Sequence, residues 1–126
     1  MELVWQRYDW FLLQEALKNY YCLYVLHHQK DGDRPFYIGK AKHLGRRYKN
    51  NRHMLEAMSR SGYSLYVASI GEASFIWAEH WEQELIALWK PISKQRKIGH
   101  MRLPVITEKP WRLTYSPFGR LKLKKD

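Results

Sequence analysis

The chain has 126 residues, the length of one domain, and its 45% hydrophobic and 15% aromatic residues exclude the composition of a disordered protein. A formal net charge of +10 favours polyanionic partners, nucleic acid first and an anionic membrane surface second, although lysine and arginine can also serve solubility alone. The single cysteine, Cys22, excludes an internal disulfide and a cysteine-based zinc site.

The start of the chain lacks the pattern of an export signal. Residues 1–7 do not have the basic-then-apolar order of a signal peptide. No apolar run approaches the roughly 20 residues that a membrane-spanning helix needs. We therefore expect a cytoplasmic protein without a membrane partner.

The first third of the chain predicts a helix followed by a hairpin. Residues 8–19 carry apolar side chains at the spacing of an amphipathic helix. The continuous apolar run 21–26 is short enough to be a buried strand. Residues 29–35 include an Asp-Gly step suited to a two-residue turn, and 36–39 supply the returning strand.

The middle of the chain predicts helix, strand and helix. A stripe of apolar residues begins near His43 and ends at Ser61, followed by a strand over 63–70. The longest helix spans about 73–89 and is closed by Pro91. We expect an α/β (α+β) fold with a small, mainly antiparallel three-stranded sheet flanked by helices.

These elements divide the chain into a helical extension (1–20), a compact domain (21–95) and a basic tail (96–126). The tail contains nine lysines and arginines against two acidic residues, a net of +7 out of the total +10. Its prolines argue against a helix. The tail aromatics Trp111 and Tyr115 could stack on unpaired bases or close a strand against the domain, and both readings stay open.

Two tyrosines are the first candidates for chemistry. In the predicted hairpin, Tyr24 faces Gly39 and Tyr37 faces Leu26, which places both phenols on one face of the sheet as diagonal neighbours. They can equally be ordinary strand aromatics.

Arg47 and Glu82 are two charges near apolar surfaces. Arg47 lies beside the apolar stripe of its helix, where a phosphate or a structural salt bridge would explain it. Glu82 falls inside the apolar arc of the helix over 73–89, which is costly for a carboxylate unless it is paired or bound to a metal. An internal salt bridge between these two residues is the simpler alternative.

The motifs resemble those of the GIY-YIG nucleases. Residues 37–47, YIGKAKHLGRR, are similar to the second half of that signature and its arginine, particularly as found in the nuclease domain of the bacterial excision-repair incision subunit. Residues 22–26 resemble the first half, with Cys22 in place of the usual glycine. The segment around Glu82 is similar to the helix with the family's metal-binding glutamate. The resemblance covers about residues 21–94.

Two positions depart from the family's pattern. Where the family commonly has an asparagine after the last helix, this chain has Ser93 and Lys94. The family often has a histidine or tyrosine soon after the arginine, for which the candidates are Asn51 and, preferred, His53.

The resemblance implies hydrolysis of DNA phosphodiester bonds with one divalent cation, Mg²⁺ or in its place Mn²⁺, held by Glu82. It implies that Arg47 stabilises the phosphate and that Tyr24 is the general base, with Tyr37 bonded to it or ordering the water. Lys40 and Arg47 are then expected to lower the pKa of the Tyr24 phenol. The catalytic set is Tyr24, Tyr37, Arg47, Glu82, Lys40 and His53. The residues expected to contact nucleic acid are Lys40, Lys42, Arg46, Arg47, Arg96, Lys97, Arg102 and Arg112.

The expected partner is duplex or branched DNA, and a homodimer or protein partner through exposed tryptophans such as Trp5 or Trp10 is left open. One rival interpretation is a catalytically silent nucleic-acid-binding module on the same fold. Another is a basic RNA- or ribosome-associated protein, which would explain the charge but not Glu82 on its apolar arc.

Overall fold

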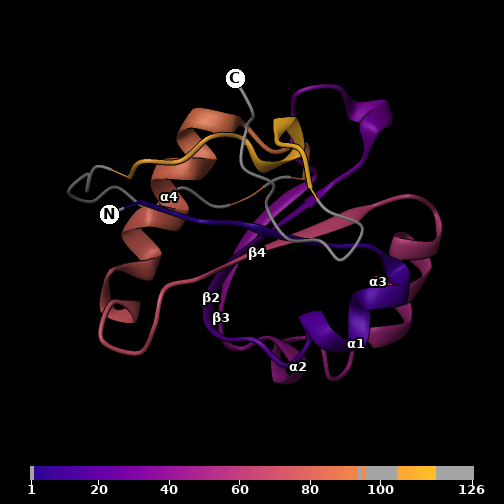
Figure 1. The fold of residues 1–126 in the computed structure, drawn as a ribbon, viewed down its shortest axis with the longest axis horizontal. Helices are drawn as coiled ribbons and strands as arrows, with labels where there is room; N and C mark the ends of the chain where they lie inside the picture. Colours follow the sequence, from indigo (N-terminus) through magenta and orange to yellow (C-terminus); the bar gives the residue numbers. More distant parts are fainter. Residues whose placement is uncertain (1, 94, 96–104, 116–126) are drawn as a thin grey trace.

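The structure is a computed structural model that describes residues 2–93, 95 and 105–115 (Figure 1). Its α+β class and antiparallel sheet agree with the prediction. The sheet of the described chain has four strands rather than three, in the order β1-β4-β2-β3, with every neighbouring pair antiparallel. The strands are β1 (Gln6–Tyr8), β2 (Tyr20–His27), β3 (Tyr37–His43) and β4 (Ser64–Ser69).

The extra strand comes from residues predicted as the start of a helix. Residues 6–8 pair with β4, and the N-terminal helix is confined to the short η1 and α1. The helix predicted from His43 onward is split in two, because the chain leaves helical geometry at Tyr48 and re-enters it after Asn51. An asparagine pair there favours a turn. The helical elements are η1 (Trp10–Leu12), α1 (Leu13–Ala16), η2 (Gln29–Asp31), α2 (Leu44–Arg47), α3 (Arg52–Arg60), η3 (Phe75–Trp77), α4 (Ala78–Trp89) and η4 (Pro110–Arg112).

The sheet buries a different core on each face. One face is covered by α1, α2 and α3 and is called the phenol face, because it holds the rings of Tyr24, Tyr37 and Tyr48. The opposite face is covered by α4 and by residues 105–115, as Figure 1 shows. We call it the tryptophan face. Its tryptophans are Trp5, Trp81, Trp89 and Trp111.

The described part of the predicted tail packs against the domain. Trp111 stacks on His27 with ring centroids 4.5 Å apart and contacts Trp89 at 5.3 Å, and Tyr115 is buried. The amide of Leu3 donates to the carbonyl of Ile106 at 2.8 Å. Of the two readings for these aromatics, closure against the domain is the one observed.

The same segment is fastened to the loop before β3. Asp33 accepts hydrogen bonds from Lys109 Nζ at 2.7 Å and Trp111 Nε1 at 3.1 Å, and it forms an ion pair with Arg112. The expectation that Trp5 is exposed was wrong, since it is 2% exposed beneath this segment, whereas Trp10 is 55% exposed. Among the described residues, no helix is long and apolar enough to cross a membrane.

Candidate active site

The β2–β3 hairpin brings the two tyrosines together in the predicted register. Tyr24 is opposite Gly39 and Leu26 is opposite Tyr37. The ring centroids of Tyr24 and Tyr37 are 6.0 Å apart. The predicted two-residue turn was wrong, because strand pairing stops at Leu26 and Tyr37 and a longer connection containing η2 joins the strands. The register is therefore correct although the turn is not.

The position opposite Tyr24 has to be a glycine for steric reasons. A Cβ atom at Gly39 would lie 2.4 Å from Cζ and 2.5 Å from Oη of Tyr24, so any side chain would displace the ring. The Tyr24 ring lies across β3, and Gly39 allows the ring to pack against the strand. Close packing, rather than a special backbone angle, explains this glycine.

A third phenol, Tyr48, completes this cluster. Its ring contacts Tyr24 edge-on at 5.7 Å, and it is buried directly after Arg47. The sequence analysis assigned Tyr48 to the apolar stripe of a helix and preferred His53 as the extra site residue. His53 is exposed on α3. A polar hydroxyl on an otherwise apolar stripe was the signal that could have identified Tyr48.

Burial governs the chemistry of Tyr24. Its side chain is 0% exposed, and its hydroxyl forms no hydrogen bond of normal geometry with the described residues. Burial raises the pKa of the Tyr24 phenol far above its usual range, and the neighbouring Tyr48 raises this pKa further, whereas Arg47 lowers it less. The expected lowering of the Tyr24 pKa is therefore outweighed. Tyr37 is only half-buried and is the phenol of the pair that water can reach.

Arg47 lies in the last turn of α2 and is exposed. Its pKa is raised, first by the charge of an ionised Tyr24 and also by Tyr37, because a phenolate favours the charged guanidinium. Its helix is anchored by His43, whose Nδ1 accepts from the Arg46 amide at 3.0 Å. Within the described residues Arg47 forms no ion pair, so the alternative of a salt bridge to Glu82 is not observed.

Glu82 is half-buried on α4, within the apolar arc that was predicted. Burial raises the pKa of its carboxyl, while Lys40 and, more weakly, Arg47 lower it. Lys40 lies on β3 opposite Leu23, on the tryptophan face, whereas Arg47 comes from the phenol face. Both α2 and α4 contact the edge strand β3, and across this strand the two cations act on the Glu82 carboxylate electrostatically.

The donor set restricts which metal could bind here. The described residues contain no group of three or more histidine, cysteine, aspartate or glutamate side chains suited to a metal. Magnesium ions are typically held through one or two carboxylates together with substrate phosphates and several waters. A single Glu82 carboxylate near two cations fits a Mg²⁺ or Mn²⁺ ion that arrives with a phosphate, because the phosphate offsets the positive charge.

Gln95 is a site residue that the sequence analysis missed. Its Oε1 accepts from the Ile38 amide at 2.8 Å, and its Nε2 donates to the carbonyl of the same residue. The neighbouring amides of Ile92 and Ser93 donate to the carbonyls of Pro35 and Phe36. These bonds satisfy the open edge of β3 beside Tyr37. Gln95 supplies an amide in the stretch where an asparagine was sought, although Lys94 lies outside the described residues.

Besides Lys40 and Arg47, which are described above, the predicted nucleic-acid contacts divide into three groups. Lys42 and Arg46 are exposed near the site. Arg112 is paired with Asp33 and serves the fold. The remaining tail positions, Arg96, Lys97 and Arg102, lie outside the described residues.

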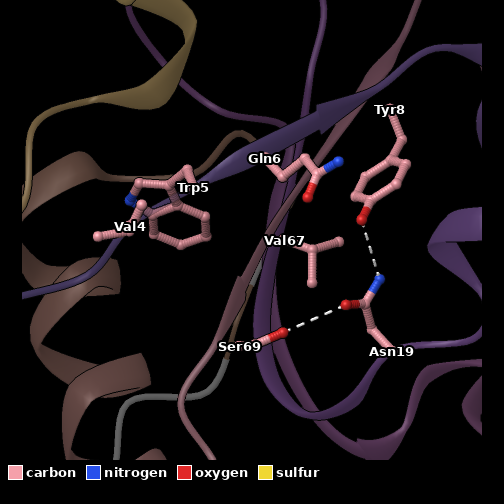
Figure 2. A pocket seen from close by; sticks show the side chains of 7 residues that line it. All are labelled: Val4, Trp5, Gln6, Tyr8, Asn19, Val67 and Ser69. Carbon is pink, nitrogen blue, oxygen red and sulfur yellow. Dashed lines mark hydrogen bonds between the residues drawn. The ribbon is translucent and has the colours of Figure 1, made fainter. Parts of the chain in front are cut away.

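A shallow hollow of about 400 Å³ lies toward the other edge of the sheet (Figure 2). Asn19 bridges the hydroxyls of Tyr8 and Ser69 at 3.3 and 3.2 Å there. The described residues that line the hollow carry no charge, so it has no cation to offset the charge of a phosphate. Its lining is Val4, Trp5, Gln6, Tyr8, Asn19, Val67 and Ser69.

Comparison with known proteins places the chain in no group: no family model, no curated protein and no solved structure matches it.

Proposed function

We propose that the chain is a metal-dependent endonuclease that hydrolyses DNA phosphodiester bonds on a GIY-YIG-like fold. The observation that carries this proposal is that α2 with Arg47 and α4 with Glu82 both contact β3, and that Arg47 interacts electrostatically with Tyr37 and with Glu82. Tyr24 packs against Tyr37, and Tyr48 packs against Tyr24. A guanidinium, a water-accessible phenol and a half-buried carboxylate are the groups that in-line hydrolysis of a phosphodiester needs. The net charge of +10 suits a polyanionic substrate.

Each residue has a distinct role in this proposal. Arg47 binds the scissile phosphate and offsets its developing charge. Tyr37 orients the attacking water and, as its phenolate, takes up the proton of that water, because the buried hydroxyl of Tyr24 is not accessible to solvent. Lys40 supports the phosphate beside Glu82.

Glu82 would hold the divalent cation. When bound, Mg²⁺ supplies Lewis-acid stabilisation of the leaving oxygen. Because burial raises the pKa of Glu82, its carboxylate is protonated at a higher pH than an ordinary glutamate, whose pKa is about 4.3. A bound cation competes with this proton, so metal binding should weaken as the pH falls.

The experiment measures cleavage of labelled duplex, single-stranded and branched DNA in Mg²⁺ and Mn²⁺, with DNA binding measured in parallel without metal. Glu82→Gln keeps the shape of the side chain and removes its charge, so cleavage should fall on the order of 100-fold or more while the protein still binds DNA. Glu79→Gln, an exposed neighbour on the same helix, is the matched control and should keep its activity.

A catalytically silent nucleic-acid-binding module is the second candidate. The observation that favours it is the buried, unbonded hydroxyl of Tyr24, a packing role rather than a chemical one. Binding of all three DNAs with no cleavage in either metal would establish this candidate and sink the nuclease proposal.

A further inference from the structure

Four aromatic rings form a row at the end of the sheet where β2 begins. We call His43, Tyr20, Tyr21 and Phe75 the aromatic row. The ring of Tyr20 lies 4.3 Å from that of His43 and 6.4 Å from that of Tyr21, and Tyr21 lies 5.6 Å from Phe75. Three separate segments, β3, β2 and η3, supply these rings.

An unusual backbone conformation at Tyr21 brings the rings of the aromatic row together. Neighbouring residues of a regular strand point to opposite faces, so their rings diverge. Tyr21 has a φ of 46°, a left-handed conformation that non-glycine residues seldom adopt. This turn lets the rings of Tyr20 and Tyr21 lie side by side. Such strain persists where the surrounding structure holds it, and it often marks a functional position.

Tyr20 is both exposed and held in place. Its side chain is 56% exposed. The ring of His43 that supports it is fixed in turn, because His43 caps α2 through the Arg46 amide. The amide of Leu44 also donates to the carbonyl of Asn19 at 3.0 Å, which ties the start of β2 to α2. The exposed face of Tyr20 therefore needs little ordering before it binds a flat partner.

The row begins and ends at the two helices of the candidate active site. His43 directly precedes α2, which holds Arg47, and Phe75 opens η3, which runs into α4 with Glu82. Figure 1 shows α2 and the start of α4 toward the same end of the sheet. His43 lies four positions after Gly39 on β3, a span of roughly 13 Å at the usual rise of a strand.

Charges around the row are unequal. The His43 end has the exposed cations Lys42 and Arg46, whereas the Phe75 end has the exposed acids Glu72 and Glu79. A nucleic-acid strand would place its phosphates along the cationic end and its bases over the rings. An acidic or purely apolar protein segment would not use the cations and the ring faces together.

We infer that the aromatic row binds unpaired bases of the DNA strand next to the cleaved bond, so that the preferred substrate is branched or partly single-stranded DNA. This inference rests on the proposed function and names its substrate class. Unpaired bases expose the faces that stack on aromatic side chains, whereas bases in a continuous duplex already stack on one another. Among the described tail aromatics, Tyr115 is buried in the core and Trp111 packs against it, so neither replaces the aromatic row.

The test measures fluorescence anisotropy of labelled single-stranded, branched and fully duplex DNA with the full chain in metal-free buffer. Tyr20→Ala should bind single-stranded and branched DNA roughly tenfold more weakly or worse, because stacking on one base accounts for a loss of that order. Tyr20→Phe keeps the ring and should bind like the original protein. Phe11→Ala, an aromatic exposed to a similar extent on η1, is the matched control.

The outcomes separate this inference from the proposed function. A loss confined to DNAs with unpaired bases, restored by Tyr20→Phe, supports the aromatic row. An equal loss on all three DNAs, no loss on any, or binding of the original protein to duplex alone overturns it. In those cases metal-dependent cleavage that Glu82→Gln abolishes would still stand, and the proposed function would survive without the row.

Discussion

The two faces of the sheet are built and used differently. On the phenol face the three candidate phenols, Tyr24, Tyr37 and Tyr48, come from one stretch of the chain, although the core around them also includes Tyr8 and Val67. The tryptophan face joins distant segments: Trp5 contacts Trp89 at 6.0 Å, and Trp89 contacts Trp111 at 5.3 Å. The phenol face holds hydroxyl groups whose pKa values are raised by burial. The tryptophan face holds large apolar surfaces that the described part of the C-terminal segment covers.

This difference suggests that one face of the sheet mainly stabilises the fold, whereas the other mainly positions the candidate site residues. Burial of indole rings supplies much apolar area, so the tryptophan face stabilises the fold. On the phenol face, the Tyr24 ring packs so closely against Gly39 that the positions of the candidate side chains are tightly constrained. The candidate site lies at β3, which both α2 with Arg47 and α4 with Glu82 contact, and across which the Arg47 charge acts on the Glu82 carboxyl. The substitutions predicted below each alter one face of the sheet or the segment that covers it.

Gly39→Ala should have the largest effect and should act on the phenol face. The added Cβ would lie 2.4 Å from Cζ of Tyr24, so either the ring or the strand must move. We expect a loss of about 3 kcal/mol in the free energy of unfolding, near the upper end for overpacking, together with loss of cleavage. Urea denaturation and the cleavage assay measure the two effects.

A second background tests the cause of this loss. Leucine at position 24 lacks the atoms that the new Cβ would meet, so Gly39→Ala should cost much less in a Tyr24→Leu protein. Equal costs in both backgrounds would show that the Tyr24 ring is not the reason for the glycine.

Trp111→Ala should act on the tryptophan face alone. Truncation of a fully buried tryptophan costs about 3–5 kcal/mol, and Trp111 is only partly buried, so we expect about 2 kcal/mol. Cleavage per folded molecule should stay unchanged. Trp77→Ala, 42% exposed, should cost at most about 0.5 kcal/mol. If cleavage falls further than stability explains, the division between the faces is wrong.

Tyr24→Phe should separate packing from catalysis within the phenol face. Among the described residues the buried hydroxyl of Tyr24 forms no hydrogen bond of normal geometry, and the Tyr48 hydroxyl lies near it, so its removal should change stability by at most about 1 kcal/mol. Cleavage should persist, whereas Tyr37→Phe should remove most of it. The opposite pattern would return the role of general base to Tyr24.

Asp33→Asn should have the smallest effect, and a pH-dependent one. Arg112 first, and then Lys109, hold the pKa of the Asp33 carboxyl well below its usual range. Because this pKa is lower in the folded than in the unfolded protein, the stabilisation is present above pH about 3.9 and is lost as the pH falls through the folded pKa. The urea midpoint of the variant should therefore lie slightly below that of the original protein at pH 7.

The pH series supplies the control for this prediction. The difference in midpoint between the two proteins should shrink as the pH falls below 3, and it should also shrink in high salt. Glu15→Gln, which breaks an exposed local pair with Lys18, should shift the midpoint less. A difference that persists in strong acid would mean that Asp33 acts through something other than its charge.

Much of the candidate site could be predicted because its geometry is local. Strand periodicity and a symmetric hairpin were enough to pair Tyr24 with Gly39, even though the turn itself was longer than expected. Helical periodicity placed Glu82 in an apolar arc. Gln95 and Tyr48 were missed because their roles depend on which backbone edge or ring lies beside them, and no spacing along the chain reports that.

The sequence by itself determined the order of the central elements, the antiparallel hairpin and the face on which each candidate residue lies. These follow from side-chain periodicities of 2 and 3.6 residues, which are local properties of the chain. Only the tertiary structure decided that β1 adds a fourth strand, that Trp111 of the C-terminal segment packs against the tryptophan face and that Tyr24 is sealed from water. These depend on burial between distant segments, because the exposure and pKa of a group are set by everything packed around it.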